Sequence, residues 1–229
     1  MGDFIQLGTS RTQCIGAYLA RPQGQTRGGI VVVQEIFGVN AWVRSVVDRF
    51  AAHGYTTIAP AFFDHVESGV ELGYDEANLV RARALVGEIS FERALEDVAS
   101  AAQSIASAGK VGVVGYCWGG TIALLSAIRL GLPAVSYYGG RNVQILDQPL
   151  AAPVQFHFGE QDGSIPAAAV QRHRDSYAAQ IEAGTVEIYT YAGGHAFDRN
   201  VDPTHYAAAS AKLARERTLA FFDSRLRNG

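Results

Sequence analysis

Hydrophobic runs of strand length alternate along the chain with segments whose apolar residues recur at helical spacing. The β-branched run at residues 28–35 predicts a strand buried on both faces. The segment that follows, residues 40–54, places Trp42, Val46 and Phe50 on one face of a predicted helix. The same change from strand to helix recurs down to the C-terminus, so the chain has the pattern of an α/β protein.

The other predicted elements complete this alternation. Further strands are expected at residues 13–20, 55–63, 110–115, 133–140, 152–159 and 185–191. Further helices are expected at residues 74–88, 90–109, 118–131, 166–184 and 204–226. Such an order predicts a mostly parallel sheet with helices on both faces. No internal repeat or linker interrupts it, so we expect residues 1–229 to form a single domain.

Composition narrows the range of functions. Hydrophobic residues make up 48% of the 229 residues and charged residues 18%, which is enough apolar material for a sizeable core. The net charge of −3 and the lack of a basic run argue against nucleic acid as a partner. No apolar run is long enough to cross a membrane, and the first ten residues do not resemble a secretory signal. We therefore expect a cytoplasmic protein, and in that compartment a disulfide between its two cysteines would be unusual.

One of these cysteines stands where a strand turns sharply into a helix. Gly115, Cys117 and Gly119 match the pattern glycine–x–nucleophile–x–glycine, with cysteine where serine is more common. Glycines allow the strand and the helix to approach closely around the turn, and the helix N-terminus favours negative charge on sulfur. A glycine-rich turn with an incidental cysteine is the alternative. The predicted strand and helix on either side favour Cys117 as a nucleophile.

A nucleophile of this kind needs a base, and the base needs an acid that orients it. His195 directly follows the strand predicted at residues 185–191, and Asp162 follows the strand predicted at residues 152–159. Their order after the cysteine is the chain order of this type of triad. Glu160 is the rival of Asp162, and the five other histidines lie in or beside predicted helices, inside a strand or in a loop before the thiol. The sequence thus predicts a Cys117–His195–Asp162 triad.

A second carboxylate, Glu35, lies at the carboxyl end of its predicted strand. A charge in that place is costly unless it is paired or functional, although a solvated loop side chain is an alternative. A working Glu35 would face the thiol and either accept its proton or hold the sulfur away from the imidazole. The backbone N–H groups of Ile36 and Trp118 are the expected oxyanion hole, one from the residue after the nucleophile and one from the other loop.

Four motifs in order give the chain a resemblance to a known family. The stretches QEIFGVN, VGYCWGG, GEQDGSIP and GGHAFDR resemble those of the dienelactone hydrolase (carboxymethylenebutenolidase) family of α/β-hydrolases, over nearly the whole chain. The resemblance implies an α/β-hydrolase fold and a triad at Cys117, Asp162 and His195. It also implies that Glu35 binds the resting thiol and moves away when substrate binds.

The resemblance bears on the substrate as well. It implies that Arg199 holds a substrate carboxylate. Ungapped comparison puts Leu79 where the family has a second carboxylate-binding arginine, and Arg81 and Arg83 lie nearby. A shift of two residues turns a helical side chain by roughly 200°. Either one of these arginines substitutes through a different backbone path, or the enzyme prefers another acyl group.

Cysteine as the nucleophile limits the substrates. A thiol has a pKa of about 8.5 and leaves readily, so an ordinary alkoxide is not expelled in its place, whereas an enolate is. We therefore expect hydrolysis of an activated ester or enol lactone bearing a carboxylate, with Phe37 and Tyr138 in the pocket and no metal or organic cofactor. A broader carboxylesterase or thioesterase and a thiol redox sensor are the alternatives. The protein is expected to be a monomer or a weak homo-oligomer.

Overall fold

The computed structural model describes residues 1–9 and 14–227. These residues form two compact units, residues 1–113 with the C-terminal residues from 226, and residues 114–225. Strand β5 (Val111–Tyr116) crosses the boundary in sequence, and Cys117, Asp162 and His195 all belong to the second unit. The prediction of a single domain is not tested by this division and stays a prediction.

The first unit consists of strands covered by helices. Its strands are β1 (Asp3–Gly8), β2 (Cys14–Ala20), β3 (Gly29–Val33) and β4 (Thr56–Pro60), in the order β1-β2-β4-β3. Its helices are α1 (Ala41–Ala52), α2 (Glu76–Glu88) and α3 (Phe91–Ser104), with short 3₁₀ turns η1 (Phe62–His65) and η2 (Ala106–Ala108). β3 pairs with β4 in parallel and is buried along its whole length, as its β-branched run predicts. β1 and β2 run antiparallel to their neighbours.

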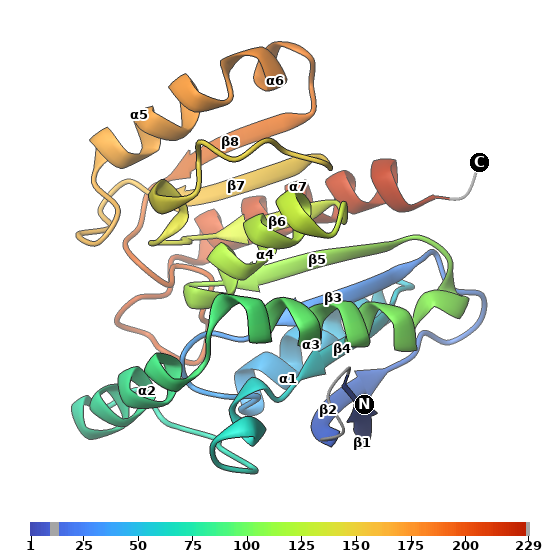
Figure 1. The fold of residues 1–229 in the computed structure, drawn as a ribbon. Coiled ribbons are helices and arrows are strands. Elements are labelled where there is room, and N and C mark those ends of the chain that lie inside the picture. The colour runs from blue at the N-terminus through green and yellow to red at the C-terminus, as the bar shows by residue number, and fades with distance from the viewer. Residues whose placement is uncertain (10–13, 228–229) are drawn as a thin grey trace. The chain divides into compact units, whose positions relative to one another are not determined.

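The second unit continues the alternation of strand and helix. It contains α4 (Trp118–Arg129), β6 (Ala134–Tyr137), η3 (Asn142–Gln144), β7 (Val154–Gly159), α5 (Ala167–Ser176), α6 (Ala178–Glu182), β8 (Val186–Tyr191) and α7 (Ala208–Leu226). β6, β7 and β8 lie side by side and are parallel, so their carboxyl ends meet at one edge (Figure 1). The helix predicted at residues 166–184 is in fact two helices, because the backbone at Tyr177 leaves the helical conformation.

Helices cover both faces of β7. Its side chains alternate between the two faces. Phe156 and Phe158 pack against His173 of α5, with ring centroids 5.1 and 4.8 Å away. His157, on the opposite face, lies 3.1 Å from the hydroxyl of Thr218 in α7. The predicted arrangement of helices on both faces therefore holds for this part of the sheet.

A buried polar chain links α7 to the strands. The Thr218 hydroxyl lies 2.7 Å from that of Tyr137, and His157 completes its hydrogen bonds with Tyr191 and Gln155, each at 2.8 Å. Because every one of these groups is hydrogen-bonded, burying them does not leave an unsatisfied polar atom. This chain of hydrogen bonds holds β6 in place, and β6 is the strand that ends beside the candidate nucleophile.

Candidate active site

Cys117 lies in the turn between β5 and α4. Its backbone has φ 55° and ψ −115°, a conformation that costs a non-glycine residue free energy and is typical of a strained nucleophile turn. The N–H of Cys117 donates to the carbonyl of Tyr137 at 3.0 Å. A Cβ at Gly115 would lie 1.8 Å from the carbonyl oxygen of Gly119. Only glycine at position 115 lets strand and helix approach this closely.

Asp162 and His195 lie beyond the carboxyl ends of neighbouring parallel strands. Asp162 follows β7 and His195 follows β8, so the two loops meet at one edge of the sheet. The Nδ1 of His195 is 2.7 Å from the Oδ2 of Asp162, whose side chain is fully buried, while the imidazole is 30% exposed. The contact with Asp162 uses one ring nitrogen of His195 and leaves the other, Nε2, outside it.

The side chain of Cys117 also forms a hydrogen bond with His195. Burial alone would lower the pKa of His195, but the hydrogen bonds and charges of Asp162 and Cys117 raise it to about 10. Burial would likewise raise the pKa of Asp162, and hydrogen bonds from His195 and Ser164 lower it below its usual range. The structure therefore brings the three predicted residues together, with the imidazole hydrogen-bonded to both the sulfur and the carboxylate.

Two aromatic residues adjoin this triad. Tyr138 has φ 39°, is fully buried and places its ring centroid 5.0 Å from that of His195. Trp118 is the buried first residue of α4, directly after the cysteine. The positive end of the α4 dipole thus lies at the sulfur, where it favours a thiolate.

The predicted residues of the first unit are placed as follows. Glu35, two residues beyond β3, is 1% exposed, so the alternative of a solvated loop side chain is wrong. Ile36 is half-buried, and the buried ring of Phe37 packs edge-on against Tyr74 with centroids 4.8 Å apart. Arg81 lies on the exposed side of α2 and forms an ion pair with Glu67.

Arg199 is buried and its guanidinium already has an acidic partner. Its NH2 group donates to Oδ2 of Asp202 at 2.7 Å, and the same oxygen is 2.7 Å from Nδ1 of the exposed His205. A substrate carboxylate that approached Arg199 would have to compete with Asp202. Leu79, the position of the second expected arginine, is a half-buried residue of α2.

The other histidines have structural environments. His157 and His173 are fully buried, and burial lowers the pKa of His173 to about 4. His65 bonds to the buried Asp97 at 2.8 Å, and His53 caps the end of α1. None of these four has a cysteine among its hydrogen-bond partners in the described residues.

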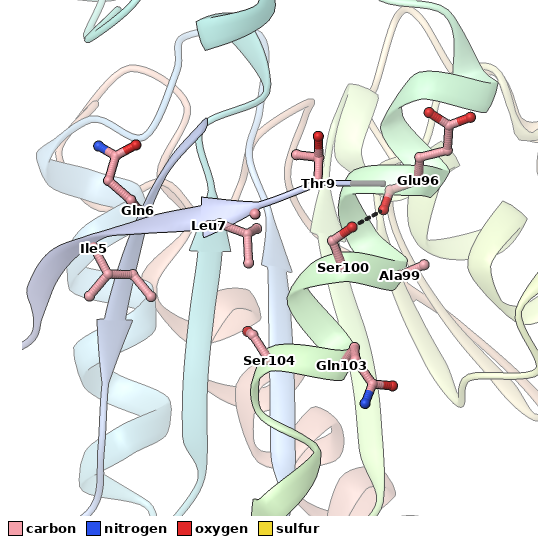
Figure 2. Close-up of a pocket in the computed structure, with 10 residues that line it drawn as sticks. Ile5, Gln6, Leu7, Thr9, Glu96, Ala99, Ser100, Gln103 and Ser104 are labelled. Carbon is pink, nitrogen blue, oxygen red and sulfur yellow. Dashed lines mark hydrogen bonds between the residues drawn. The ribbon is translucent and has the colours of Figure 1, made fainter. Parts of the chain in front are cut away.

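A separate hollow lies in the first unit between β1 and α3. It has a volume of about 580 Å³, and Ile5 and Leu7 of the strand face Ser100 and Ser104 of the helix across it (Figure 2). Glu96 is the one ionisable side chain among its lining residues, which include neither a cysteine nor a histidine. Within residues 1–9 and 14–227, no three acidic, histidine or cysteine side chains are grouped to hold a metal ion. No helix in the same ranges is long and apolar enough to span a membrane.

Comparison with known proteins agrees with the motifs. The model of the dienelactone hydrolase family matches residues 15–226. The chain belongs to the dienelactone hydrolase family. Carboxymethylenebutenolidases of Pseudomonas putida and Pseudomonas knackmussii are each 34% identical to it over 215 residues, 90% of this chain and 89% of theirs. The crystal structure named "Putative Dienelactone Hydrolase" from Klebsiella pneumoniae superposes with a TM-score of 0.85 at 30% identity, covering 97% of this chain and 98% of that one.

Membership of the dienelactone hydrolase family makes the protein a hydrolase with an α/β-hydrolase fold, as the sequence predicts. Sequence reasoning missed two polar residues beside the predicted ones, Ser164 next to Asp162 and Asp202 next to Arg199. The only signal for Ser164 is its place two residues after an aspartate in a turn, a position that favours a local hydrogen bond. Nothing in the sequence pattern singles out Asp202.

Proposed function

We propose that this hydrolase cleaves activated esters and enol lactones, such as dienelactone (carboxymethylenebutenolide), through a Cys117–His195–Asp162 triad and an acyl-thioester intermediate. The observation that carries the proposal is the position of the His195 imidazole, which is hydrogen-bonded to Asp162 at 2.7 Å and also to Cys117. The hydrogen bonds and charges of Asp162 and Cys117 raise the pKa of His195, which suits an imidazole that holds and then gives up a proton during the reaction.

The reaction has two halves. The Cys117 sulfur attacks the carbonyl carbon, and the carbonyl electrons move to the oxygen, where the N–H groups of Ile36 and Trp118 are the proposed donors. Collapse of the tetrahedral intermediate breaks the carbon–oxygen bond, and an enolate leaves. His195 gives its proton to the departing enolate and becomes neutral. The neutral imidazole then takes a proton from water as the water attacks the thioester, the carbon–sulfur bond breaks and the sulfur leaves as thiolate, while Asp162 holds the imidazole.

The leaving group decides the substrate class. In the tetrahedral intermediate the sulfur competes with the ester oxygen as the group to be expelled. A plain alkoxide is a much stronger base than a thiolate, so the intermediate returns to the starting ester. An enolate is stabilised by resonance and departs. Enol lactones and other activated esters are therefore the proposed substrates, and Arg199 is the proposed anchor for a substrate carboxylate.

Turnover of defined esters tests this proposal. We expect the protein to hydrolyse cis- or trans-dienelactone and p-nitrophenyl acetate, and to be slow on ethyl acetate. Cys117→Ala should abolish the activity, whereas Cys14→Ala, at an exposed cysteine of β2, should leave it unchanged. Activity that survives Cys117→Ala would refute the thioester route. Peroxide consumption without any ester hydrolysis would favour the thiol redox sensor.

The proposed role of Glu35 has its own test. If its carboxylate acts on the resting thiol, Glu35→Gln should change the rate at which iodoacetamide alkylates Cys117 in the absence of substrate. The measurement is made in the Cys14→Ala background, so that only one cysteine reacts. An unchanged rate would remove Glu35 from the mechanism.

A further inference from the structure

We propose that Ser164 is a positioning residue, whose hydroxyl fixes the Asp162 carboxylate and the tautomer of His195. The inference rests on the triad of the proposed function and adds a residue to it. Ser164 stands in the turn that follows Asp162, before the start of α5, and its side chain contacts both other groups.

The two carboxylate oxygens of Asp162 accept hydrogen bonds from different residues. Oδ1 of Asp162 accepts the Ser164 hydroxyl at 2.6 Å and the Ser164 backbone N–H at 2.8 Å. Oδ2 accepts from Nδ1 of His195 at 2.7 Å. With Oδ1 occupied by two donors, the carboxylate cannot rotate freely about its terminal torsion. Oδ2 is thereby kept in the plane that the imidazole needs.

The serine oxygen also faces the imidazole. It lies 3.2 Å from Nδ1 of His195, and its own hydrogen is directed to the carboxylate. Its lone pairs are then available to the Nδ1 hydrogen, which is shared between Oδ2 and the hydroxyl oxygen. A hydrogen on Nδ1 leaves the other ring nitrogen for the exchange of a proton with the sulfur or with water. Both contacts of the hydroxyl therefore favour one tautomer and one ring orientation.

Only the hydroxyl depends on the residue type at position 164. The backbone N–H donates to Asp162 as in other aspartate turns, whatever side chain follows. Ser164→Ala therefore removes one donor and one acceptor and leaves the turn in place. The side chain is at the surface, so the change creates no cavity.

The charged groups around the imidazole remain the same in this variant. Asp162 and Cys117 act on His195 through hydrogen bonds and charge, and Tyr138 packs its ring against it at 5.0 Å. Loss of the hydroxyl makes Asp162 easier to protonate, because one of the bonds that lower its pKa disappears. As the pH is lowered, the activity of Ser164→Ala should therefore begin to fall at a higher pH than the activity of the parent.

The experiment compares Ser164→Ala and Ser164→Thr with the parent on p-nitrophenyl acetate from pH 4 to pH 9. For Ser164→Ala we expect kcat to fall about fivefold with KM unchanged. The apparent pKa on the acid side of the kcat/KM profile should rise by about half a pH unit. Ser164→Thr keeps the hydroxyl and should restore both. Superimposable pH profiles of parent and Ser164→Ala would overturn the proposal, as would a Thr variant that behaves like Ala.

A second readout does not need turnover. In the Cys14→Ala background, the pH dependence of Cys117 alkylation by iodoacetamide should shift in the same direction in Ser164→Ala. An alkylation profile that does not move refutes the role of Ser164 whether or not the ester is hydrolysed. If Cys117→Ala keeps full esterase activity while the alkylation profile does shift, the proposed function has failed and the positioning of His195 by Ser164 stands. Urea unfolding checks that the variants are folded.

Discussion

Replacement of Gly115 by alanine tests how the nucleophile turn is built. The added Cβ would lie 1.8 Å from the carbonyl oxygen of Gly119 and 2.3 Å from its carbonyl carbon, both backbone atoms of the first turn of α4. In protein structures a Cβ essentially never lies within 3.0 Å of a heavy atom outside its own neighbours in the chain. β5 and α4 therefore have to separate by about 1.2 Å at this point. Gly115 does not have a positive φ, so the effect is a contact and not a backbone preference.

The displacement acts directly on Cys117, which lies between the two colliding residues. A misplacement of about 1 Å costs catalysis on the order of 100-fold, and forcing atoms into a packed contact costs roughly 1–3 kcal/mol of folding free energy. We therefore expect Gly115→Ala to lose about 100-fold in kcat/KM while it remains folded at 25 °C. The assay is hydrolysis of p-nitrophenyl acetate, with urea unfolding to measure the stability.

Gly140→Ala is the matched control, because a Cβ at Gly140 meets no atom within 4 Å. It should keep the activity and the stability of the parent. If Gly115→Ala is folded and retains activity within about threefold of the control, the close approach of strand and helix is not what positions the sulfur. The steric reasoning for the turn would then be refuted.

Three further changes test charge and hydrogen bonding. Asp162→Asn should lower kcat about 10²- to 10⁴-fold, because an amide can favour the wrong tautomer of His195; a loss below tenfold in steady-state kinetics would contradict the proposed triad. Asp202→Asn should remove the ion pair that competes with a substrate carboxylate for Arg199 and lower KM for carboxylate-bearing lactones several-fold, with KM for p-nitrophenyl acetate unchanged as the control. His173 has a pKa of about 4 when folded and 6.5 when unfolded, so its stabilisation is complete above pH 6.5 and is lost as pH falls toward 4. Between pH 7 and pH 5 this loss is about 2 kcal/mol, and urea unfolding of His173→Phe should show a pH dependence weaker by that amount.

The sequence predicted the parts of the fold that have strong periodicity. The hydrophobic run at residues 28–35 predicts a buried strand, and the structure has β3 there. The glycines around Cys117 predict a sharp turn from strand to helix, and the structure has the turn into α4 there. β1 was missed because Leu7 is the one buried residue of a strand at the end of the order in its unit, so the strand has no clear alternation. The break at Tyr177 was missed as well, since apolar spacing continues through it.

The sequence names residues that the structure brings together at the candidate site, but it does not predict most of their hydrogen bonds. Order along the chain suffices to name Cys117, Asp162 and His195, because parallel strands bring their carboxyl ends together. The partners of charged groups depend on side-chain geometry that leaves no periodic trace. Arg81 meets Glu67, which comes from a loop before its helix, and Arg199 meets Asp202. The roles of all these residues stay predictions until the variants are measured.

Tyr137 links a residue near the C-terminus to the turn that holds Cys117. Its carbonyl receives the Cys117 N–H at 3.0 Å, and its hydroxyl meets Thr218, which is 81 residues away in sequence. A nonsense mutation between codons 196 and 218 would therefore leave every residue of the proposed triad encoded and still remove the anchor of the tyrosine whose carbonyl receives that N–H. Such a truncation also removes the buried Phe221 and Phe222, so the C-terminal helix supplies both core packing and the hydrogen bond that anchors Tyr137.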